Sequence, residues 1–345
     1  MSTTTSTTET TQATSSDSRG VVAPLLFGFF PNRVLNVAAT LALPDRLLDG
    51  PRTTDDLAAE TGTHAPSLYR VLRALACFGI LAETEPGTFA LGPHGRSLLT
   101  DDPASLRHLV LLFSGDGVWR SWGELGETVR TGEPAWDRIT GMSAFEHMAA
   151  HPDEQEMFNR AMSEATRNAV PGIIEVGGFD RFHHVVDVGG GDGTLLAAVL
   201  DAHPGLVGTL FDTADGLREA PDHLARVAGD FFTSVPGGAD CYLTKSVIHD
   251  WDDDRAATIL ASIRRVIPDG GRLLVVEPVM PASPAGSADV LMMVMSDLNM
   301  LVCTGGKERT EAEFRELFAA GGFSLDRIAP ATGPTNFSVL EGVPA

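Results

Sequence analysis

The sequence predicts an α/β protein in which a mostly helical N-terminal part precedes a parallel β-sheet with crossover helices. From about Phe182 onward, apolar β-branched runs alternate with helical stretches, as they do in a parallel sheet. One of these runs, at 184–188, enters a turn of four glycines and continues as a helix. Earlier in the chain, residues 53–99 follow the order helix, helix and two short strands, which is the winged-helix pattern.

Length and charge limit the classes of protein to consider. The 345 residues suffice for two domains, and the 43% that are apolar can form a sizeable core. Lys and Arg number 25 against 46 Asp and Glu, which gives a formal net charge of −21. We expect neither nucleic acid nor a membrane as a partner, because phosphate backbones and anionic lipid surfaces repel so acidic a chain.

The cysteines and the N-terminus favour a cytoplasmic protein. The three cysteines are dispersed, which argues against a disulfide framework and against a cysteine zinc site: Cys77, Cys241 and Cys303. The first residues lack the basic and apolar regions of a secretory signal. The apolar stretch at 21–43 is interrupted by Pro-Asn-Arg, so we expect a packed helix there rather than a membrane span.

Changes in composition suggest four segments. Residues 1–19 are mostly Ser, Thr and acidic, too polar to form a core, and we expect a disordered tail there. We expect a winged-helix-like domain at 20–103, with ordered helix from near Val21, and a helical region at 104–178. The α/β domain should span 179–345.

The winged-helix-like part suggests a structural role more than DNA recognition. Its first helix should begin at the capping residue Thr53 and end at Gly62, and its second should begin at Pro66. Two strands at 80–83 and 88–91 complete the pattern. The second helix offers only two basic side chains in an acidic setting, so we favour a dimerising module.

In the C-terminal part we expect six strands. Four should be parallel and the last two should close the sheet as an edge hairpin: 184–188, 209–211, 241–245, 273–277, 323–328 and 337–341.

The glycine turn after the first of these strands allows a ligand to approach the backbone closely. A dinucleotide fingerprint needs G-x-G-x-x-G, whereas here Thr194 stands where the last glycine should fall. Asp187 and Asp192 flank the turn and would repel a pyrophosphate, but they tolerate a zwitterionic or cationic ligand. Asp212 ends the next strand, where a carboxylate can accept hydrogen bonds from ribose hydroxyls. An adenosyl ligand without phosphates fits this pattern; a turn that only packs helix on strand is the alternative.

Five segments in this order resemble those of the S-adenosylmethionine-dependent O-methyltransferases of the plant caffeic-acid/acetylserotonin type and their bacterial natural-product branch. They are D-V-G-G-G-D-G at 187–193, Asp212, G-D-F-F at 229–232, K-S-V-I-H-D-W at 245–251 and G-K-E-R-T at 306–310. The resemblance runs from about residue 21 to the end. It implies a Rossmann-like S-adenosylmethionine methyltransferase domain and a homodimer formed through the N-terminal winged-helix-like domain.

The resemblance also implies which residues contact ligands. The implied contacts to S-adenosylmethionine are Ser163, Asp187, Gly189, Gly190, Gly191, Asp212, Gly229, Asp230, Phe231, Lys245 and Ser246. The implied contacts to the acceptor are Met162, Asp250, Asn299 and Met300.

The order of the strands brings one imidazole and two carboxylates to the same edge of the sheet. His249 follows the strand at 241–245, Glu277 ends the next strand, and Glu308 precedes a later helix. A neutral hydroxyl needs a base to become a methyl acceptor. Transfer of a proton from a phenol of pKa ~10 to a histidine of pKa ~6.5 is uphill by roughly 5 kcal/mol, and a nearby carboxylate narrows that gap. By resemblance, His249 is the general base and the two glutamates bracket it.

Each of these residues also has a plainer interpretation. His249 could be an ordinary hydrogen-bonded histidine, Glu277 a solvated strand end, and Glu308 a helix N-terminal charge. No metal-binding motif is evident, so we expect metal-independent transfer.

The expected function is therefore methyl transfer to a phenolic or enolic hydroxyl of a small aromatic or polyketide-like natural product. Two alternatives remain. One is a methyltransferase-like enzyme that uses S-adenosylmethionine for hydroxylation or a pericyclic rearrangement. The other is a ligand-responsive winged-helix DNA-binding protein.

Overall fold

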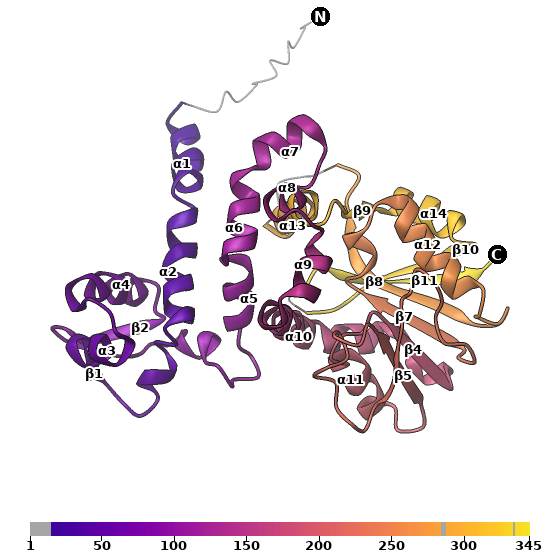
Figure 1. The fold of residues 1–345 in the computed structure, drawn as a ribbon, viewed down its shortest axis with the longest axis horizontal. Helices are drawn as coiled ribbons and strands as arrows, with labels where there is room; N and C mark the ends of the chain where they lie inside the picture. Colours follow the sequence, from indigo (N-terminus) through magenta and orange to yellow (C-terminus); the bar gives the residue numbers. More distant parts are fainter. Residues whose placement is uncertain (1–14, 284–287, 334) are drawn as a thin grey trace, which may run out of the picture. The chain divides into compact units, whose positions relative to one another are not determined.

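The computed structural model describes residues 15–283, 288–333 and 335–345, which divide into two units, Met1–Gly95 and Arg96–Ala345 (Figure 1). The disordered tail expected at 1–19 lies mostly outside the described residues. Helix α1 covers Ser15–Leu26, so ordered helix begins before the expected Val21.

The N-terminal unit has the winged-helix order that the sequence predicts. It contains four helices and a three-stranded sheet with the order β1-β3-β2, and α3 and α4 pack on this sheet. The bounds are α1 Ser15–Leu26, α2 Phe29–Thr40, β1 Arg52–Thr53, α3 Thr54–Thr61, α4 Ala65–Cys77, β2 Leu81–Glu85 and β3 Thr88–Leu91.

Local sequence explains these boundaries. The Thr53 hydroxyl accepts a hydrogen bond from the Asp56 amide and caps α3, which ends at Gly62 in the left-handed conformation. Helix α4 buries Leu68 and Leu72, the apolar positions at helical spacing that the sequence indicates. By contrast, the end of α1 and the start of α2 expose a run of large apolar side chains: Leu25, Leu26, Phe27, Phe29 and Phe30.

The C-terminal unit begins with helices and continues as a Rossmann-like α/β domain. The first helices are α5 Arg107–Phe113, α6 Asp116–Gly123, α7 Leu125–Thr131, α8 Ala135–Thr140, α9 Ala144–Ala150 and α10 Pro152–Gly177. The later helices are α11 Thr194–Ala202, α12 Asp253–Arg264, α13 Ala288–Cys303 and α14 Glu311–Ala320.

The large sheet has eight strands in the order β10-β11-β8-β7-β4-β5-β6, with β9 paired to β8. Strands β4 to β8 run parallel, and β11 and β10 are antiparallel at one edge. The bounds are β4 His184–Val188, β5 Val207–Asp212, β6 Ala225–Ala228, β7 Cys241–Lys245, β8 Arg272–Met280, β9 Arg309–Thr310, β10 Phe323–Pro330 and β11 Phe337–Pro344. The six expected strands and the edge hairpin are confirmed, whereas β6 and β9 were not expected.

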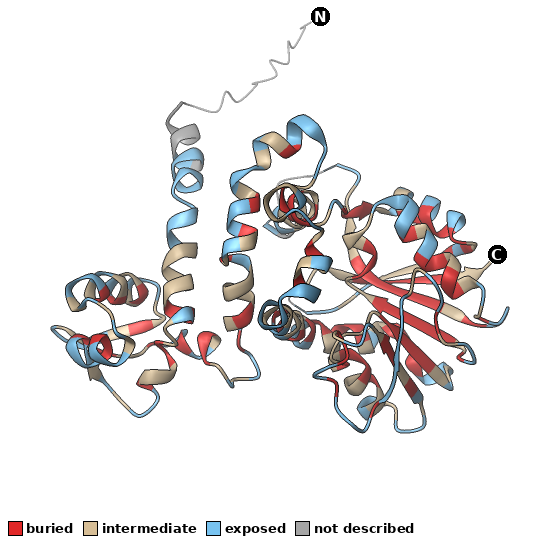
Figure 2. Ribbon diagram, viewed as in Figure 1, coloured by how far each residue is buried: buried red, intermediate tan, exposed pale blue. Residues whose placement is uncertain are grey.

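Helices cover both faces of this sheet, and its central strands β4, β7 and β8 are mostly buried between them (Figure 2). One apolar core includes Ile259 and Leu260 of α12 and Phe314 of α14. The other includes Ile173 of α10 and Leu196 of α11. Because both faces are covered, the parallel strands read as continuous apolar runs.

The order of strands reverses direction at β4, which pairs with β5 on one side and with β7 on the other. In open α/β sheets, ligands bind outside the carboxyl ends of the strands at such a switch point. The glycine turn follows β4 and the His249 segment follows β7, so both lie at this position. Among the helices that the structure describes, none is long and apolar enough to cross a membrane.

Candidate active site

The glycine turn after β4 needs glycine for two physical reasons. Gly189, Gly191 and Gly193 have φ of 73°, 59° and 79°, in the left-handed region that favours glycine. A Cβ on Gly190 would lie 2.5 Å from the Leu210 side chain and 2.6 Å from Asp187 Oδ2. At Gly191, no described atom lies within 4 Å of such a Cβ, so the turn is open there for a ligand.

Three aspartates surround this turn. Asp212 Oδ2 accepts a hydrogen bond from the Gly191 amide at 2.9 Å, and its burial raises the pKa of its carboxyl. Asp192 accepts from the Ser163 hydroxyl of α10 and from the Thr194 amide. Asp187 is buried, and its Oδ2 finds no hydrogen-bond partner among the described residues. Burial, with the neighbouring Asp212 charge, raises the pKa of Asp187 to about 7.

Lys245 is the last residue of β7, and Ser246 follows that strand. The Lys245 ammonium donates to Ser246 Oγ at 3.0 Å and lies 4.5 Å from the centre of the Phe337 ring. Burial lowers the pKa of Lys245 to about 8, against the opposing effect of Glu277 and Asp187. Ser246 has φ of 52°, which is uncommon for a residue other than glycine.

The G-D-F-F segment lies beside Asp212. The Gly229 amide donates to the Asp212 carbonyl oxygen at 2.9 Å, and a Cβ on Gly229 would lie 2.5 Å from the Phe211 ring. Asp230 Oδ1 accepts from the Phe232 amide at 2.8 Å. The Phe231 ring centre lies 4.8 Å from that of Phe232 in an edge arrangement.

His249 lies in a short helical turn, Ile248–Asp250, directly after β7. Its Nδ1 is 3.0 Å from Glu308 Oε1 and 3.5 Å from Glu277 Oε2. Its Nε2 is 3.9 Å from Asp250 Oδ1, beyond hydrogen-bond distance. The imidazole is therefore held through Nδ1, and Nε2 is the nitrogen left to meet another group.

Glu277 is wholly buried, so the interpretation as a solvated strand end is wrong. Its Oε1 accepts hydrogen bonds from three successive amides: Val247 at 3.0 Å, Ile248 at 3.0 Å and His249 at 3.4 Å. This carboxyl therefore fixes the backbone that carries the imidazole.

Glu308 is also buried and contacts the imidazole directly. Its Oε1 accepts from His249 Nδ1 and from the Ser296 hydroxyl at 2.7 Å, while its amide donates to Asp297 Oδ1 at 2.9 Å. A carboxylate that served only as a charge at a helix N-terminus would not need these contacts. They fix the Glu308 carboxylate, which in turn orients the His249 ring.

Burial and charge act in opposite directions on the groups of this cluster. Burial disfavours a charged imidazole, but the carboxylates of Glu277, Asp250 and Glu308 outweigh it and raise the pKa of His249 to about 10. Burial raises the pKa of Asp250 to about 7 and raises that of Glu277. For Glu308, burial acts to raise the pKa, but the hydrogen bond and charge of His249, the Ser296 hydroxyl and the Arg309 charge together lower it.

Arg309 is a residue of this site that the sequence reasoning missed. It is wholly buried, and it donates to the carbonyl oxygens of Ile248 at 3.0 Å and Trp251 at 2.8 Å and to Asp253 at 2.9 Å. Its place in G-K-E-R-T was visible in the sequence, but no spacing rule indicated that this arginine would point inward.

Gly306 and Lys307 also contact the turn Ile248–Asp250 that carries His249. The Lys307 amide donates to the His249 carbonyl oxygen at 2.9 Å, and a Cβ on Gly306 would overlap that oxygen.

The expected acceptor contacts lie on α10, α13 and the His249 turn. Asn299 Oδ1 accepts from Trp122 Nε1 at 3.0 Å, which fixes the orientation of the amide, and Met300 is buried next to it. Met162 lies on α10, one residue before Ser163. Trp251, which follows Asp250, stacks on Phe145 of α9 with ring centres 5.2 Å apart.

Within the described part of the chain, two groups of side chains could hold a metal ion: His249, Glu277 and Glu308, and on the surface His147, His151 and Glu154. In the first group, Oε1 of each glutamate accepts hydrogen bonds from backbone amides or from Ser296 and the imidazole, whereas Oε2 of each finds no hydrogen-bond partner among the described residues.

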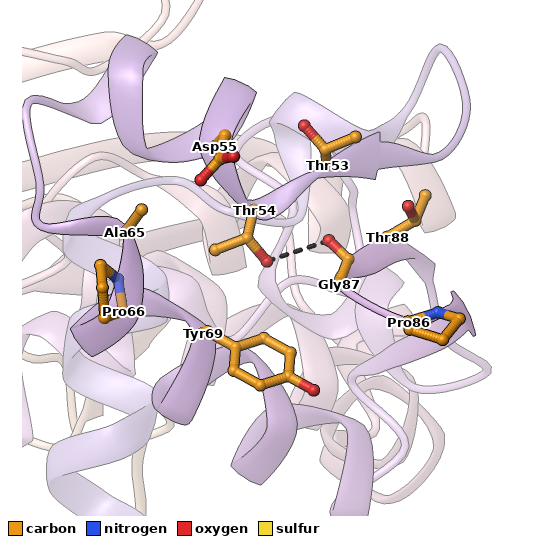
Figure 3. A pocket seen from close by; sticks show the side chains of 9 residues that line it. All are labelled: Thr53, Thr54, Asp55, Ala65, Pro66, Tyr69, Pro86, Gly87 and Thr88. Atoms are coloured by element: carbon orange, nitrogen blue, oxygen red, sulfur yellow. Dashed lines mark hydrogen bonds between the residues drawn. The ribbon is translucent and has the colours of Figure 1, made fainter.

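A separate hollow of about 450 Å³ lies within the N-terminal unit (Figure 3). Thr54 Oγ1 donates to the Gly87 carbonyl oxygen at 3.0 Å across it, with Tyr69 and Pro86 at its wall. It contains none of the residues expected to bind a cofactor or an acceptor.

Comparison with known families matches both parts of the chain. A family model described as the O-methyltransferase domain matches residues 122–324. A second, described as the O-methyltransferase dimerisation domain, matches residues 24–101.

Individual proteins are similar along nearly the whole chain. O-demethylpuromycin-O-methyltransferase of Streptomyces alboniger is 41% identical over 335 residues, which are 94% of this chain and 88% of the relative. The crystal structure of an O-methyltransferase from neocarzinostatin biosynthesis, with S-adenosylmethionine and 2-hydroxy-5-methyl naphthoic acid, has a TM-score of 0.76 at 33% identity and covers 91% of this chain and 96% of its own. Human N-acetylserotonin methyltransferase shares the fold, with a TM-score of 0.87 at 24% identity, covering 97% of this chain and 100% of its own.

Proposed function

Because this chain belongs to the O-methyltransferase family, we propose that it transfers the methyl group of S-adenosylmethionine to a phenolic or enolic hydroxyl of a small aromatic or polyketide-like natural product. The observation that carries the proposal is the imidazole of His249, held through Nδ1 by buried carboxylates at the switch point of the sheet. Relatives named for the methylation of aromatic compounds support the acceptor class.

The residues around the glycine turn suit an adenosyl ligand with a cationic centre. The open backbone at Gly191 admits a ligand, and the unpartnered, buried Oδ2 of Asp187 suits a donor such as an ammonium group. Asp212 is proposed to accept from the ribose hydroxyls, and Asp230 and Phe231 to meet the adenine. The other proposed contacts to S-adenosylmethionine are Ser163, Gly189, Gly190, Gly229, Lys245 and Ser246.

S-adenosylmethionine supplies an electrophilic methyl group and leaves as neutral S-adenosylhomocysteine. His249 accepts the hydroxyl proton at Nε2 as the oxygen–carbon bond forms and the carbon–sulfur bond breaks. Glu308 holds Nδ1–H and so fixes the ring and its tautomer. Because a base and an oriented hydroxyl are sufficient for this displacement, we propose that it is metal-independent. Met162, Asp250, Asn299 and Met300 are proposed to contact the acceptor.

The raised pKa of His249 removes most of the energetic gap between base and acceptor. A base whose pKa is about 10 accepts a proton from a phenol of pKa ~10 at almost no cost in free energy. The same shift leaves His249 protonated at neutral pH when no further cation is near. A positive charge close to Nε2 favours the neutral imidazole, so a cationic ligand prepares the base for its task.

We also propose that the chain consists of an N-terminal domain at 20–103, a helical region at 104–178 and a methyltransferase domain at 179–345. Two copies of the chain form a homodimer through the N-terminal domain. The match of residues 24–101 to a dimerisation domain supports it, as do the exposed apolar side chains near Phe27 and Phe30. Free cysteines at three dispersed positions suit a reducing cytoplasm.

The test is to incubate the protein with S-adenosylmethionine carrying a labelled methyl group and a panel of phenols that includes O-demethylpuromycin. We expect an O-methylated product and an equal amount of S-adenosylhomocysteine. A hydroxylated or rearranged acceptor without label would instead support the repurposed enzyme. Binding of S-adenosylhomocysteine without label transfer to any phenol of the panel would contradict the proposed acceptor class, and only the membership of the O-methyltransferase family would stand.

A further inference from the structure

We propose that His147, His151 and Glu154 bind one divalent transition-metal ion, such as Zn²⁺, at the junction between α9 and α10. One ligand atom of each side chain lies within 4.8 Å of the others. The site contains none of the residues proposed for methyl transfer, and the inference does not depend on the proposed function.

The three side chains lie around the bend where α9 ends and α10 begins. His147 lies in the last turn of α9, His151 follows that helix, and Glu154 lies in the first turn of α10. The His151 amide donates to the Met148 carbonyl oxygen at 3.0 Å, and the Glu154 amide donates to the His151 carbonyl oxygen at 3.0 Å. The backbone of His151 is not helical, with φ of −127° and ψ of 84°, so the bend between α9 and α10, rather than one helix face, brings the three side chains of H-x3-H-x2-E together.

Hydrogen bonding prepares His151 to act as a ligand. Its Nδ1 lies 2.7 Å from the His147 carbonyl oxygen, an acceptor, so Nδ1 carries the hydrogen. The lone pair of a neutral ring then lies on Nε2. Metal-binding histidines nearly always donate their other ring N–H to a carbonyl or carboxylate in this way.

His147 is held in place by its neighbours. Its ring meets the Trp136 ring edge to face, with centres 5.6 Å apart, and stacks on the His151 ring at 4.0 Å. Its Nε2 lies 3.2 Å from Glu154 Oε2, and its side chain is only 17% exposed. Glu154 and His151, its two neighbours in the group, are exposed at the surface.

The donor set suits zinc or a similar ion. Two imidazole nitrogens and one carboxylate oxygen leave a fourth position for water, as in open zinc sites. Tetrahedral ligands at 2.0–2.1 Å lie about 3.3 Å apart, so ligand atoms that lie within 4.8 Å of one another must approach by up to about 1.5 Å, through rotation of the two exposed side chains, to close the site. Imidazole donors favour zinc, copper or nickel over magnesium or calcium, and the net charge of −21 attracts cations.

An ion here would link the end of α9 to the start of α10. Helix α9 also carries Phe145, which stacks on Trp251 next to the His249 turn. Binding would therefore restrict the helix that packs beside this turn.

The test is to titrate the metal-free, full-length protein with Zn²⁺ in competition with a chromogenic chelator and to follow thermal unfolding. We expect one saturable ion per chain and a rise in Tm of about 2–5 °C at saturation. His151→Ala and Glu154→Gln, both exposed, should each weaken binding by about 10-fold or more without unfolding the protein.

The matched control is His183→Ala, which removes a 94% exposed histidine paired with a single carboxylate and should bind Zn²⁺ like the parent. The absence of a saturable site would overturn the proposal. So would unchanged binding in both His151→Ala and Glu154→Gln, because the ion would then be held elsewhere.

Discussion

At the scale of single residues, the charge around His249 determines what the imidazole can do. Its Nδ1 lies 3.0 Å from Glu308 and 3.5 Å from Glu277; both carboxylates are buried, whereas the imidazole keeps 15% of its side-chain surface exposed. The two glutamates make different contacts. Glu308 accepts hydrogen bonds from the imidazole and from the Ser296 hydroxyl, whereas Glu277 accepts hydrogen bonds from the backbone amides of the turn.

The pH dependence of the reaction should report this charge. A base must be unprotonated to act, and the carboxylates raise the pKa of His249 to about 10, so kcat/KM should rise with pH above neutrality. Glu308→Gln removes one of the carboxylates, so the rising limb should move to lower pH while kcat falls. The measurement is the pH profile of kcat/KM for both proteins. A rising limb at the same pH in both would contradict the role of Glu308.

Glu277 should contribute to the stability of the fold as well as to the charge around His249, because it accepts hydrogen bonds from backbone amides. Glu277→Ala leaves three buried amides without their acceptor, and we expect the free energy of unfolding to fall by about 3 kcal/mol. Urea denaturation measures the change. Glu316→Ala, at an exposed position in the middle of α14, is the control and should change stability by less than about 0.5 kcal/mol. A similar small change for Glu277→Ala would show that other groups satisfy those amides.

At the scale of elements, the turn Ile248–Asp250 is held from two sides. Glu277 accepts from its amides, while Arg309 and the Lys307 amide donate to its carbonyl oxygens. A turn whose backbone groups are bonded in this way keeps its side chain in place without reorganisation, which is the condition for an effective base.

Arg309→Met should therefore reduce activity through the turn rather than through ligand binding. We expect kcat to fall by about 10-fold or more, with affinity for S-adenosylhomocysteine little changed. Arg309→Lys, which keeps the charge but loses the fork of donors, should restore only part of the rate. Steady-state kinetics and calorimetry measure both effects, and Arg120→Met on exposed α6 is the control. Equal losses of kcat and cofactor affinity would instead indicate general damage to the fold.

At the scale of the whole molecule, the strands with a clear run of apolar residues could be predicted from the sequence. Strands that are exposed, and contacts that depend on how side chains pack, could not. The buried strands β4 and β7 and the hairpin of β10 and β11 appear where their apolar runs indicated. Strand β6 was missed because Ala225–Ala228 is exposed at the sheet edge and has no apolar run. The gathering of His249, Glu277 and Glu308 followed from strand order, but the inward Arg309 depends on side-chain packing that no spacing rule reveals.

The exposed apolar side chains at the start of the chain should mediate self-association. Phe27 and Phe30 are 51% and 50% exposed, in the segment that matches a dimerisation domain. The double variant Phe27→Ser/Phe30→Ser should shift the protein toward the monomer in light scattering after size exclusion. Phe78→Ser, 44% exposed in the same unit, should leave the mass unchanged. A monomeric parent protein at micromolar concentration would exclude a stable homodimer.

The most direct test of the account is a single-turnover measurement of methyl transfer to a phenol by the parent protein and by His249→Ala. We predict that the variant binds S-adenosylhomocysteine like the parent but transfers the methyl group about 100-fold or more slowly. His183→Ala, on an exposed surface, should behave like the parent. Transfer by His249→Ala at the parent rate would remove this imidazole from the reaction and contradict the account.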